Sequence, residues 1–325
     1  MSPAASASPA HLSASHGPKL VDGALWQPWK RYRKELRRCQ DKFSPNAIHD
    51  FRVESRRLLS SLALLEGFLP ARRVEKVQRL LKRHLDLFDD LRDTQVQLET
   101  LARMGRVSAA VRQFRASLRQ REERFTRRTR KQIRKVRIGR LGKLMGGCRE
   151  EVEAQLEDSK PKPALAVLGR SVARACRRAR QLRARISPCD PVTIHRTRVA
   201  FKKFRYMVEA LAQCVPGVTR PRLAAMRRYQ TMMGNIQDSE VLLRALDKFL
   251  RKQGVKPEAM RGFREQLLRR RQRLIRTYLT AADRLLKFWP LPANAHQPLT
   301  TEATGTATQL DRYLGHVSNL RQPCL

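Results

Sequence analysis

Two short stretches of this chain place a histidine, an arginine and a basic pair at the same spacing. The first is IHDFRVESRRLL at residues 48–59, and the second is IHRTRVAFKKFRY at residues 194–206. In both, an arginine follows the histidine by three residues, and two basic residues follow it by seven and eight. Positions 0, 3 and 7 share one side of an α-helix. The shared positions form two cationic rows: His49, Arg52 and Arg56, and His195, Arg198 and Lys202.

These residue types suit a ligand with closely spaced negative charges. An arginine can donate two parallel hydrogen bonds to phosphate oxygens, and a lysine supplies a point charge. A histidine, with a reference pKa of about 6.5, gains a proton readily beside a polyanion and then donates two hydrogen bonds. We therefore expect the rows to follow a linear chain of phosphates and to bind it more tightly at about pH 6 than at about pH 8.

Helical geometry extends the second row by Arg205, Tyr206 and Glu209. Apolar residues such as Phe201 occupy the other side, so the row should face solvent or a groove while the apolar side faces a bundle interior. The simpler alternative is that each row is only the solvated side of an amphipathic helix. A solvated side usually mixes charge signs to form ion pairs, whereas this row is mainly cationic and recurs elsewhere in the chain. The pattern therefore favours a binding surface.

The charge balance favours polyanionic partners. The 325 residues include 69 Lys+Arg and 29 Asp+Glu, which gives a formal net charge of +40. Such a charge favours DNA, RNA, inorganic polyphosphate or an acidic membrane surface. Residues 119–143, 170–185 and 261–276 are basic runs with helical periodicity. Aromatic residues make up 6% of the chain, and because no aromatic platform interleaves these runs we expect phosphates to be bound rather than bases.

The cysteines and the hydropathy pattern indicate a cytoplasmic protein. The six cysteines are scattered, without a C-x-x-C pair or a histidine at zinc spacing, and are expected to be reduced thiols. No apolar run approaches the roughly 18 residues of a membrane-spanning helix. The N-terminus lacks the pattern of a secretory signal. We expect no metal site and no cofactor.

The fold is expected to be all-α, with two pseudo-symmetric helical bundles of the four-helix type that arise from an internal duplication. Helix formers dominate, and nothing indicates a strand or a hairpin. The repeat has an offset of 146 residues and continues to Asp93 and Asp238, which lie 44 and 43 residues after the two histidines. Each half should contain a long histidine helix, a proline-marked turn, a second helix and a long basic third helix.

The predicted boundaries follow composition and prolines. Residues 1–20 are rich in Ala, Ser and Pro and are predicted to be disordered, and residues 291–325 are predicted to form a loose polar tail. We assign the first repeat bundle to residues 21–158 and the second to residues 164–290. The prolines of EDSKPKPA separate the two, because proline disfavours a continuous helix.

The two histidine stretches are each followed by a segment that ends in aspartate, LRD at residues 91–93 and IQD at residues 236–238. Together they resemble the conserved histidine α-helical domain, or CHAD domain, over roughly residues 25–285. The resemblance implies two four-helix bundles related by pseudo-twofold symmetry, a basic surface that binds inorganic polyphosphate, and association with polyphosphate granules. The binding residues it implies are His49, Arg52, Arg56, Arg57, His195, Arg198, Lys202, Lys203, Arg205 and Tyr206.

Further side chains are predicted to support this surface. The additional basic residues are Arg79, Lys82, Arg83, Arg227 and Arg228. Asp93 and Asp238 are expected near the ends of the second helices. There they would either orient the histidine or arginine side chains or form ordinary surface ion pairs.

Three functions compete on the sequence alone. The leading hypothesis is non-enzymatic binding of inorganic polyphosphate, and the second is general binding of RNA or DNA backbones with a steep salt dependence. The third is an enzyme, because the string around His49 faintly resembles the phosphoacceptor histidine of two-component kinases. No ATP-binding glycine boxes and no metal-binding acidic cluster accompany it. We therefore expect no enzymatic activity, and the oligomeric state is left open.

Overall fold

A computed structural model describes residues 21–104, 108–157, 161–212, 218–253 and 257–289. Within these ranges the chain is helical, and the only pairing of extended backbone is an isolated bridge between Ser187 and Asp190. The prediction of an all-α fold is confirmed. The predicted disordered segment at residues 1–20 and the predicted tail at residues 291–325 lie outside the described residues.

The helices run through both predicted halves. In the first half they are the π-helix η1 (Asp22–Trp26), α2 (Gln27–Asp41), α3 (Pro45–Leu64), the 3-10 helix η2 (Leu65–Phe68), α4 (Ala71–Asp86), α5 (Asp89–Ala102), α6 (Ala109–Arg134) and α7 (Gly139–Glu157). In the second half they are α8 (Pro161–Arg183), α9 (Pro191–Leu211), α10 (Arg220–Gln253), the 3-10 helix η3 (Pro257–Met260), α11 (Arg261–Leu279) and the 3-10 helix η4 (Ala282–Phe288). A helix ends and another begins at the predicted proline boundary.

The two histidine helices, α3 and α9, begin in the same way. Ser44 caps α3 by accepting a hydrogen bond from the backbone nitrogen of Ala47 at 3.2 Å, and Asp190 caps α9 by accepting one from that of Val192 at 3.0 Å. A proline follows each cap at the first helical position, where its missing N–H costs no hydrogen bond. The matching starts keep the two rows in the same register along their helices.

The second helix of the first half is broken, which the sequence did not predict. α4 and α5 are separated at Leu87 and Phe88, whereas the corresponding stretch of the second half is the single 34-residue helix α10. Phe88 is fully buried and packs against Phe51 with ring centroids 5.4 Å apart. The carbonyl oxygen of Leu87 accepts a hydrogen bond from the Thr129 hydroxyl of α6 at 3.0 Å. Contacts with α3 and α6 therefore bury the Phe88 side chain and satisfy the Leu87 carbonyl where the helix is interrupted.

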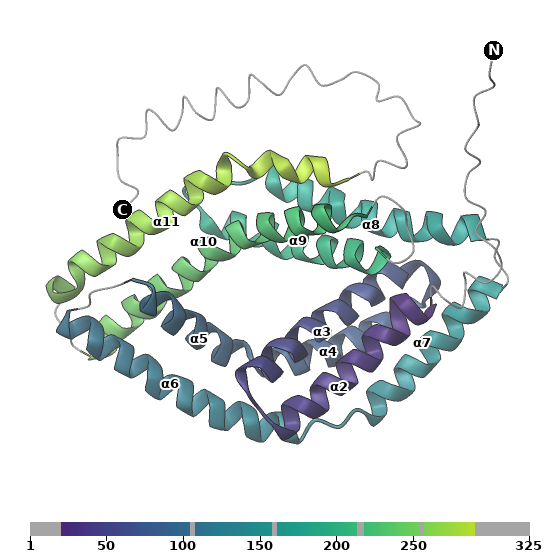
Figure 1. Cartoon of the computed structure of the whole chain (residues 1–325), viewed down its shortest axis with the longest axis horizontal. Helices are drawn as coiled ribbons and strands as arrows, with labels where there is room; N and C mark the ends of the chain where they lie inside the picture. The colour runs from purple at the N-terminus through teal and green to yellow at the C-terminus, as the bar shows by residue number, and fades with distance from the viewer. Residues whose placement is uncertain (1–20, 105–107, 158–160, 213–217, 254–256, 290–325) are drawn as a thin grey trace, which may run out of the picture.

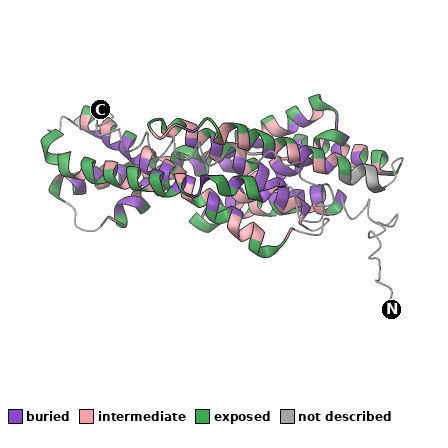
Figure 2. Ribbon diagram, turned by 90° about the horizontal axis from the view of Figure 1, so that it is seen from above, coloured by how far each residue is buried: buried purple, intermediate pink, exposed green. Residues whose placement is uncertain are grey.

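The apolar core is shared between the halves. The larger buried cluster joins Phe51 and Leu62 of α3 to Phe201 and Phe204 of α9. A smaller cluster joins the N-terminal part of α6 to the C-terminal part of α10 and to α11. Figure 2 shows the buried positions along the inside of the helix layers and the exposed ones outside. The division into two repeat bundles stays a prediction, and neither core cluster belongs to one half alone.

The histidine helices are neighbours. α3 packs against α9, α9 also packs against α8 and α10, and α10 packs against α5. Figure 1 shows α3 and α9 near the middle of an elongated molecule, with α6 and α11 along opposite long edges at one end. This arrangement turns the two cationic rows toward a common region.

Candidate anion-binding site

The two histidine helices bring parts of their cationic rows together. The charges of Arg52 and Arg56 on α3, and of Arg198 on α9, all act on Lys202 of α9. Arg56 also acts on Arg198 across the interface between the helices. We call Arg52, Arg56, Arg198 and Lys202 the paired cation cluster. The sequence predicted two rows, and the structure places their third and seventh positions beside one another.

The pKa of Lys202 is strongly shifted in this cluster. Burial and then the charges of Arg56, Arg198 and Arg52 lower the pKa of Lys202 from 10.5 to about 7, and the carboxylate of Asp89 opposes the shift. Desolvation and like charges both disfavour the protonated form of a lysine. The Lys202 side chain is therefore only partly protonated at neutral pH, because Asp89 does not fully offset burial and the neighbouring cations. A bound anion would favour its protonated form.

The arginines of the cluster are also desolvated. Arg52 is 7% exposed, and its Nη1 donates to Oδ1 of Asp89 at 3.2 Å. Burial and then the charge of Arg56 lower the pKa of Arg52 to about 10. Burial likewise lowers the pKa of Arg56 and that of Arg198. Guanidinium groups stay charged at neutral pH, so three fixed positive charges surround the titratable Lys202.

Three aspartates border the cluster. Asp89 pairs with Arg52. Burial and then Asp89 raise the pKa of Asp93 while Arg52 lowers it, and burial raises the pKa of Asp238 while Arg198 lowers it. Each of these two aspartates thus acts on the arginine three residues after a histidine, and the choice between an orienting role and an ordinary ion pair stays a prediction. The expected position near a helix end is wrong for Asp238, because α10 continues well past it.

The two histidines have different environments. His49 is exposed, whereas His195 is partly buried. Burial and then the charge of Arg198 lower the pKa of His195, and a side-chain hydrogen bond with Gln237 opposes the shift. The Nδ1 atom of His195 has no hydrogen-bond partner. In the free protein, burial and the neighbouring cations disfavour the charged form of His195, and the expectation that it gains a proton beside a polyanion stays a prediction.

Arg205 does not lie on an open cationic face, contrary to the prediction. It is 6% exposed, its guanidinium pairs with the carboxylate of Glu209, and its Nε donates to Oε1 of Gln230 at 2.8 Å. The guanidinium also lies over the ring of Tyr206, 4.1 Å from the ring centroid. Arg205 is neutralised inside the protein, and the buried Tyr206 beneath it acts on Arg56 and Arg198 of the cluster.

The other predicted basic residues lie outside the paired cation cluster. Arg57 forms an ion pair with the buried Glu54, and the exposed Arg227 forms one with Glu209 at 3.0 Å. The remaining ones are exposed and not joined to the cluster by any described contact: Arg79, Lys82, Arg83, Lys203 and Arg228. They add positive charge to the exposed surface and are not part of the desolvated paired cation cluster.

Sequence reasoning missed three residues of this region. Arg92 acts on Arg52, Arg56 and Asp238, and Arg244 acts on His195 and Asp93. Gln237 is the hydrogen-bond partner of His195. Arg92 and Gln237 directly precede the aspartates of LRD and IQD, which was an available signal.

Metal-binding clusters and membrane-spanning helices are both absent from the described ranges. No group of three or more His, Cys, Asp or Glu side chains there is arranged to hold a metal ion. None of the described helices is both long and apolar enough to cross a membrane.

Comparison with known proteins assigns this helical architecture to a family. Residues 23–247 match the family model of the CHAD domain. The chain therefore belongs to the CHAD domain family, and the resemblance noted in the two histidine stretches is confirmed. A search of curated proteins gives no match.

Solved structures share the fold. The crystal structure of the CHAD domain from the plant Ricinus communis superimposes with a TM-score of 0.63 at 20% sequence identity, covering 86% of this chain and 92% of the other. PptA from Streptomyces chartreusis superimposes with a TM-score of 0.57 at 16% identity, covering 83% of this chain and 99% of the other. At such identities the likeness concerns the arrangement of the helices.

Proposed function

We propose that this protein binds inorganic polyphosphate through the paired cation cluster without altering it chemically. The observation that carries the proposal is the convergence of Lys202 with three arginines where α3 packs against α9. Burial of like charges is unfavourable in the free protein. A chain of phosphates offers oxygens to several cations at once and would relieve their mutual repulsion.

The proposal includes an internal duplication of the binding device. Arg56 and Lys202 hold the seventh position after their histidines, and Arg52 and Arg198 hold the third. Arg56 acts on its equivalent Lys202 across the interface between α3 and α9, and it also acts on Arg198. A pseudo-twofold axis between the two helices would produce such a pairing. A linear polyanion crossing this axis would meet similar groups in either direction.

A binding test can use fluorescein-labelled polyphosphate and fluorescence anisotropy at fixed ionic strength. Replacing Arg56 and Lys202 together by alanine should weaken binding by about tenfold or more, since each charged hydrogen bond contributes roughly 1.5–3 kcal/mol. A matched control replaces the exposed Arg140 and Lys143 of α7 by alanine and changes the net charge equally. Equal weakening by both pairs would show that only net charge matters and would contradict the assignment.

The non-enzymatic character is tested separately. Incubation with polyphosphate and magnesium should release no orthophosphate, and chain length should be unchanged on a gel. Release above a protein-free blank would contradict a pure binder. In cells we propose a cytoplasmic protein associated with polyphosphate granules, and a fluorescent fusion that stays diffuse while granules are present would count against that association.

The second candidate function is binding of nucleic-acid backbones. The observation that favours it is the exposed basic surface of α6 and α11, which lies away from the paired cation cluster. Competition between polyphosphate and duplex DNA at equal phosphate concentration distinguishes the two. Preferential displacement of labelled polyphosphate by unlabelled polyphosphate supports the first function, and stronger displacement by the duplex supports the second.

A further inference from the structure

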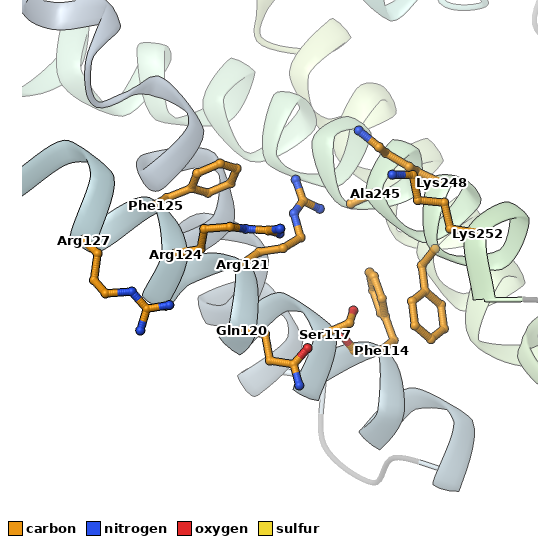
Figure 3. A pocket seen from close by; sticks show the side chains of 11 residues that line it. Phe114, Ser117, Gln120, Arg121, Arg124, Phe125, Arg127, Ala245, Lys248 and Lys252 are labelled. Carbon is orange, nitrogen blue, oxygen red and sulfur yellow. Dashed lines mark hydrogen bonds between the residues drawn. The ribbon is translucent and has the colours of Figure 1, made fainter. Parts of the chain in front are cut away.

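A pocket separate from the paired cation cluster lies between α6 and α10. Its volume of about 510 Å³ falls in the range of roughly 300–1,000 Å³ typical of small-molecule sites. Figure 3 shows Arg121 and Arg124 on the α6 side and Lys248 and Lys252 on the α10 side. Lys248 lies eleven residues beyond Gln237 on α10, which corresponds to about 16 Å along the helix axis. The pocket is therefore distinct from the histidine region.

The charges of this pocket are uniformly positive. Its lining contains five basic residues and no acidic one, with Arg127 as the fifth basic residue. Among the described ion pairs, none involves these five side chains. Asp247 of α10, which directly precedes Lys248, forms an ion pair with Arg264 of α11. The pocket thus presents cations from two helices without internal neutralisation, an arrangement suited to a ligand with several negative charges.

The floor of the pocket is aromatic. Phe114, Phe125 and Phe249 line it, although the whole chain contains only 11 phenylalanines. The guanidinium carbons of Arg121 and Arg124 lie 5.8 and 5.9 Å from the ring centroid of Phe125. Phe125 thus lies beside two arginines of its own basic run on α6, and the fold adds Phe249 of α10 to the same pocket. Guanidinium planes and aromatic rings both stack on nucleobases.

We propose that the pocket between α6 and α10 binds a nucleoside polyphosphate. The cations of both walls would hold the phosphates, and the Phe125 region with its guanidinium groups would contact the base. An inorganic phosphate chain would satisfy the walls and leave the apolar floor unused. The combination of charge and aromatic surface therefore favours a ligand that has both. This inference concerns a different site from the polyphosphate proposal and does not depend on it.

The test measures binding of ATP, tripolyphosphate and adenosine to the full chain by isothermal titration calorimetry. We expect ATP to bind more tightly than either fragment ligand. The double variant Arg121→Glu with Lys248→Glu should lower the affinity for ATP by at least about tenfold, because it reverses one charge on each wall. Arg140→Glu with Lys143→Glu is the matched control, since both residues are exposed on α7 and the change in charge is identical.

A second variant tests the aromatic floor. Phe125→Leu keeps an apolar side chain and should weaken ATP more than tripolyphosphate, while circular dichroism verifies unchanged helicity. Equal affinity for ATP and tripolyphosphate would overturn the proposal. So would ATP binding that survives the Arg121 and Lys248 reversal and is lost with Arg56→Ala and Lys202→Ala, because the nucleotide would then occupy the paired cation cluster.

Discussion

Arg56 of α3 and Lys202 of α9 lie at the same step of their rows, seven residues after His49 and His195, and Arg56 is the charged group that most lowers the pKa of Lys202. Such an arrangement destabilises the free protein, because two cations share a partly buried region. It also prepares the site for an anion, which would replace the repulsion by attraction. The stability and the proposed binding of this protein are therefore linked through Lys202.

Polyphosphate affinity should fall as the pH rises above about 7. Free Lys202 loses its proton there, since burial and the neighbouring arginines lower its pKa to about 7, and a bound anion favours the protonated form. Binding must then include uptake of a proton. The fall should approach tenfold per pH unit until the pKa of the bound state is reached. Anisotropy titrations between about pH 6 and pH 9 at constant ionic strength measure it.

Lys202→Arg serves as the control for this pH dependence. An arginine keeps its charge across the range, so the variant should lose much less affinity on going to high pH. His195→Gln should retain the wild-type profile, because burial and then Arg198 lower the pKa of His195 below its ordinary 6.5. A profile that becomes flat in His195→Gln and stays steep in Lys202→Arg would assign the titration to the histidine instead.

Lys202→Met should stabilise the ligand-free protein. The folded-state pKa of Lys202 is about 7 against an ordinary 10.5, so both folded and unfolded chains are protonated below pH 7 and the full cost of the buried charge is present there. Between pH 7 and 10.5 the unfolded chain binds more protons, and wild-type stability rises with pH. We expect a gain of more than about 1 kcal/mol at pH 6 that shrinks toward pH 10. Urea unfolding gives both values, and a gain independent of pH would contradict this account.

Arg205→Ala should act on stability rather than on binding. It leaves the carboxylate of Glu209, 11% exposed, with only the exposed Arg227 as an ionic partner. Removing one member of a buried ion pair is costly, and we expect a loss of about 2 kcal/mol or more in the free energy of unfolding. Arg227→Ala removes the other, exposed partner and should cost less than about 1 kcal/mol. If both variants lose a similar free energy of unfolding in urea, the buried Arg205–Glu209 pair stabilises the protein no more than the exposed Arg227 does.

Arg205 also shows which features of the site the sequence could predict and which it could not. The helical periodicity correctly predicted that both histidine stretches are helical, as α3 and α9, and that Phe201 lies on a buried side. It could not tell an open cation from one that is neutralised, because that depends on which helix packs over it. One local signal existed, since Glu209 follows Arg205 by four residues, a spacing that favours an ion pair. The contact with Gln230 of α10 has no such signal.

The convergence of the two rows was beyond the reach of local patterns. The repeat indicated that Arg56 and Lys202 are equivalent, but equivalence alone does not place two residues in contact. Their proximity follows from the packing of α3 on α9 through the apolar core, in which Phe51 and Phe201 take part. In the same way, Phe125 and Lys248 form one pocket only because α6 and α10 pack together at their ends.

A buried tyrosine–histidine pair should make stability depend on pH below about 6.5. The hydroxyl of Tyr32 lies 2.6 Å from Nδ1 of His84, and the tyrosine is fully buried. Burial lowers the pKa of His84 below its ordinary 6.5. In the window between the folded-state value and 6.5 the unfolded chain binds more protons, so stability is complete above 6.5 and is lost as the pH falls.

His84→Gln isolates this contribution. A glutamine can still form a hydrogen bond with Tyr32 but has no proton to gain. Other titrating groups cancel in the difference between variant and wild type. Relative to the wild type, the variant should gain stability as the pH is lowered from about 8 to about 5, because only the wild type must then exclude a proton from a buried site. Urea unfolding at both pH values gives the two differences. If they are equal, protonation of His84 is not coupled to folding, and the hydrogen bond with Tyr32 contributes the same stability at either pH.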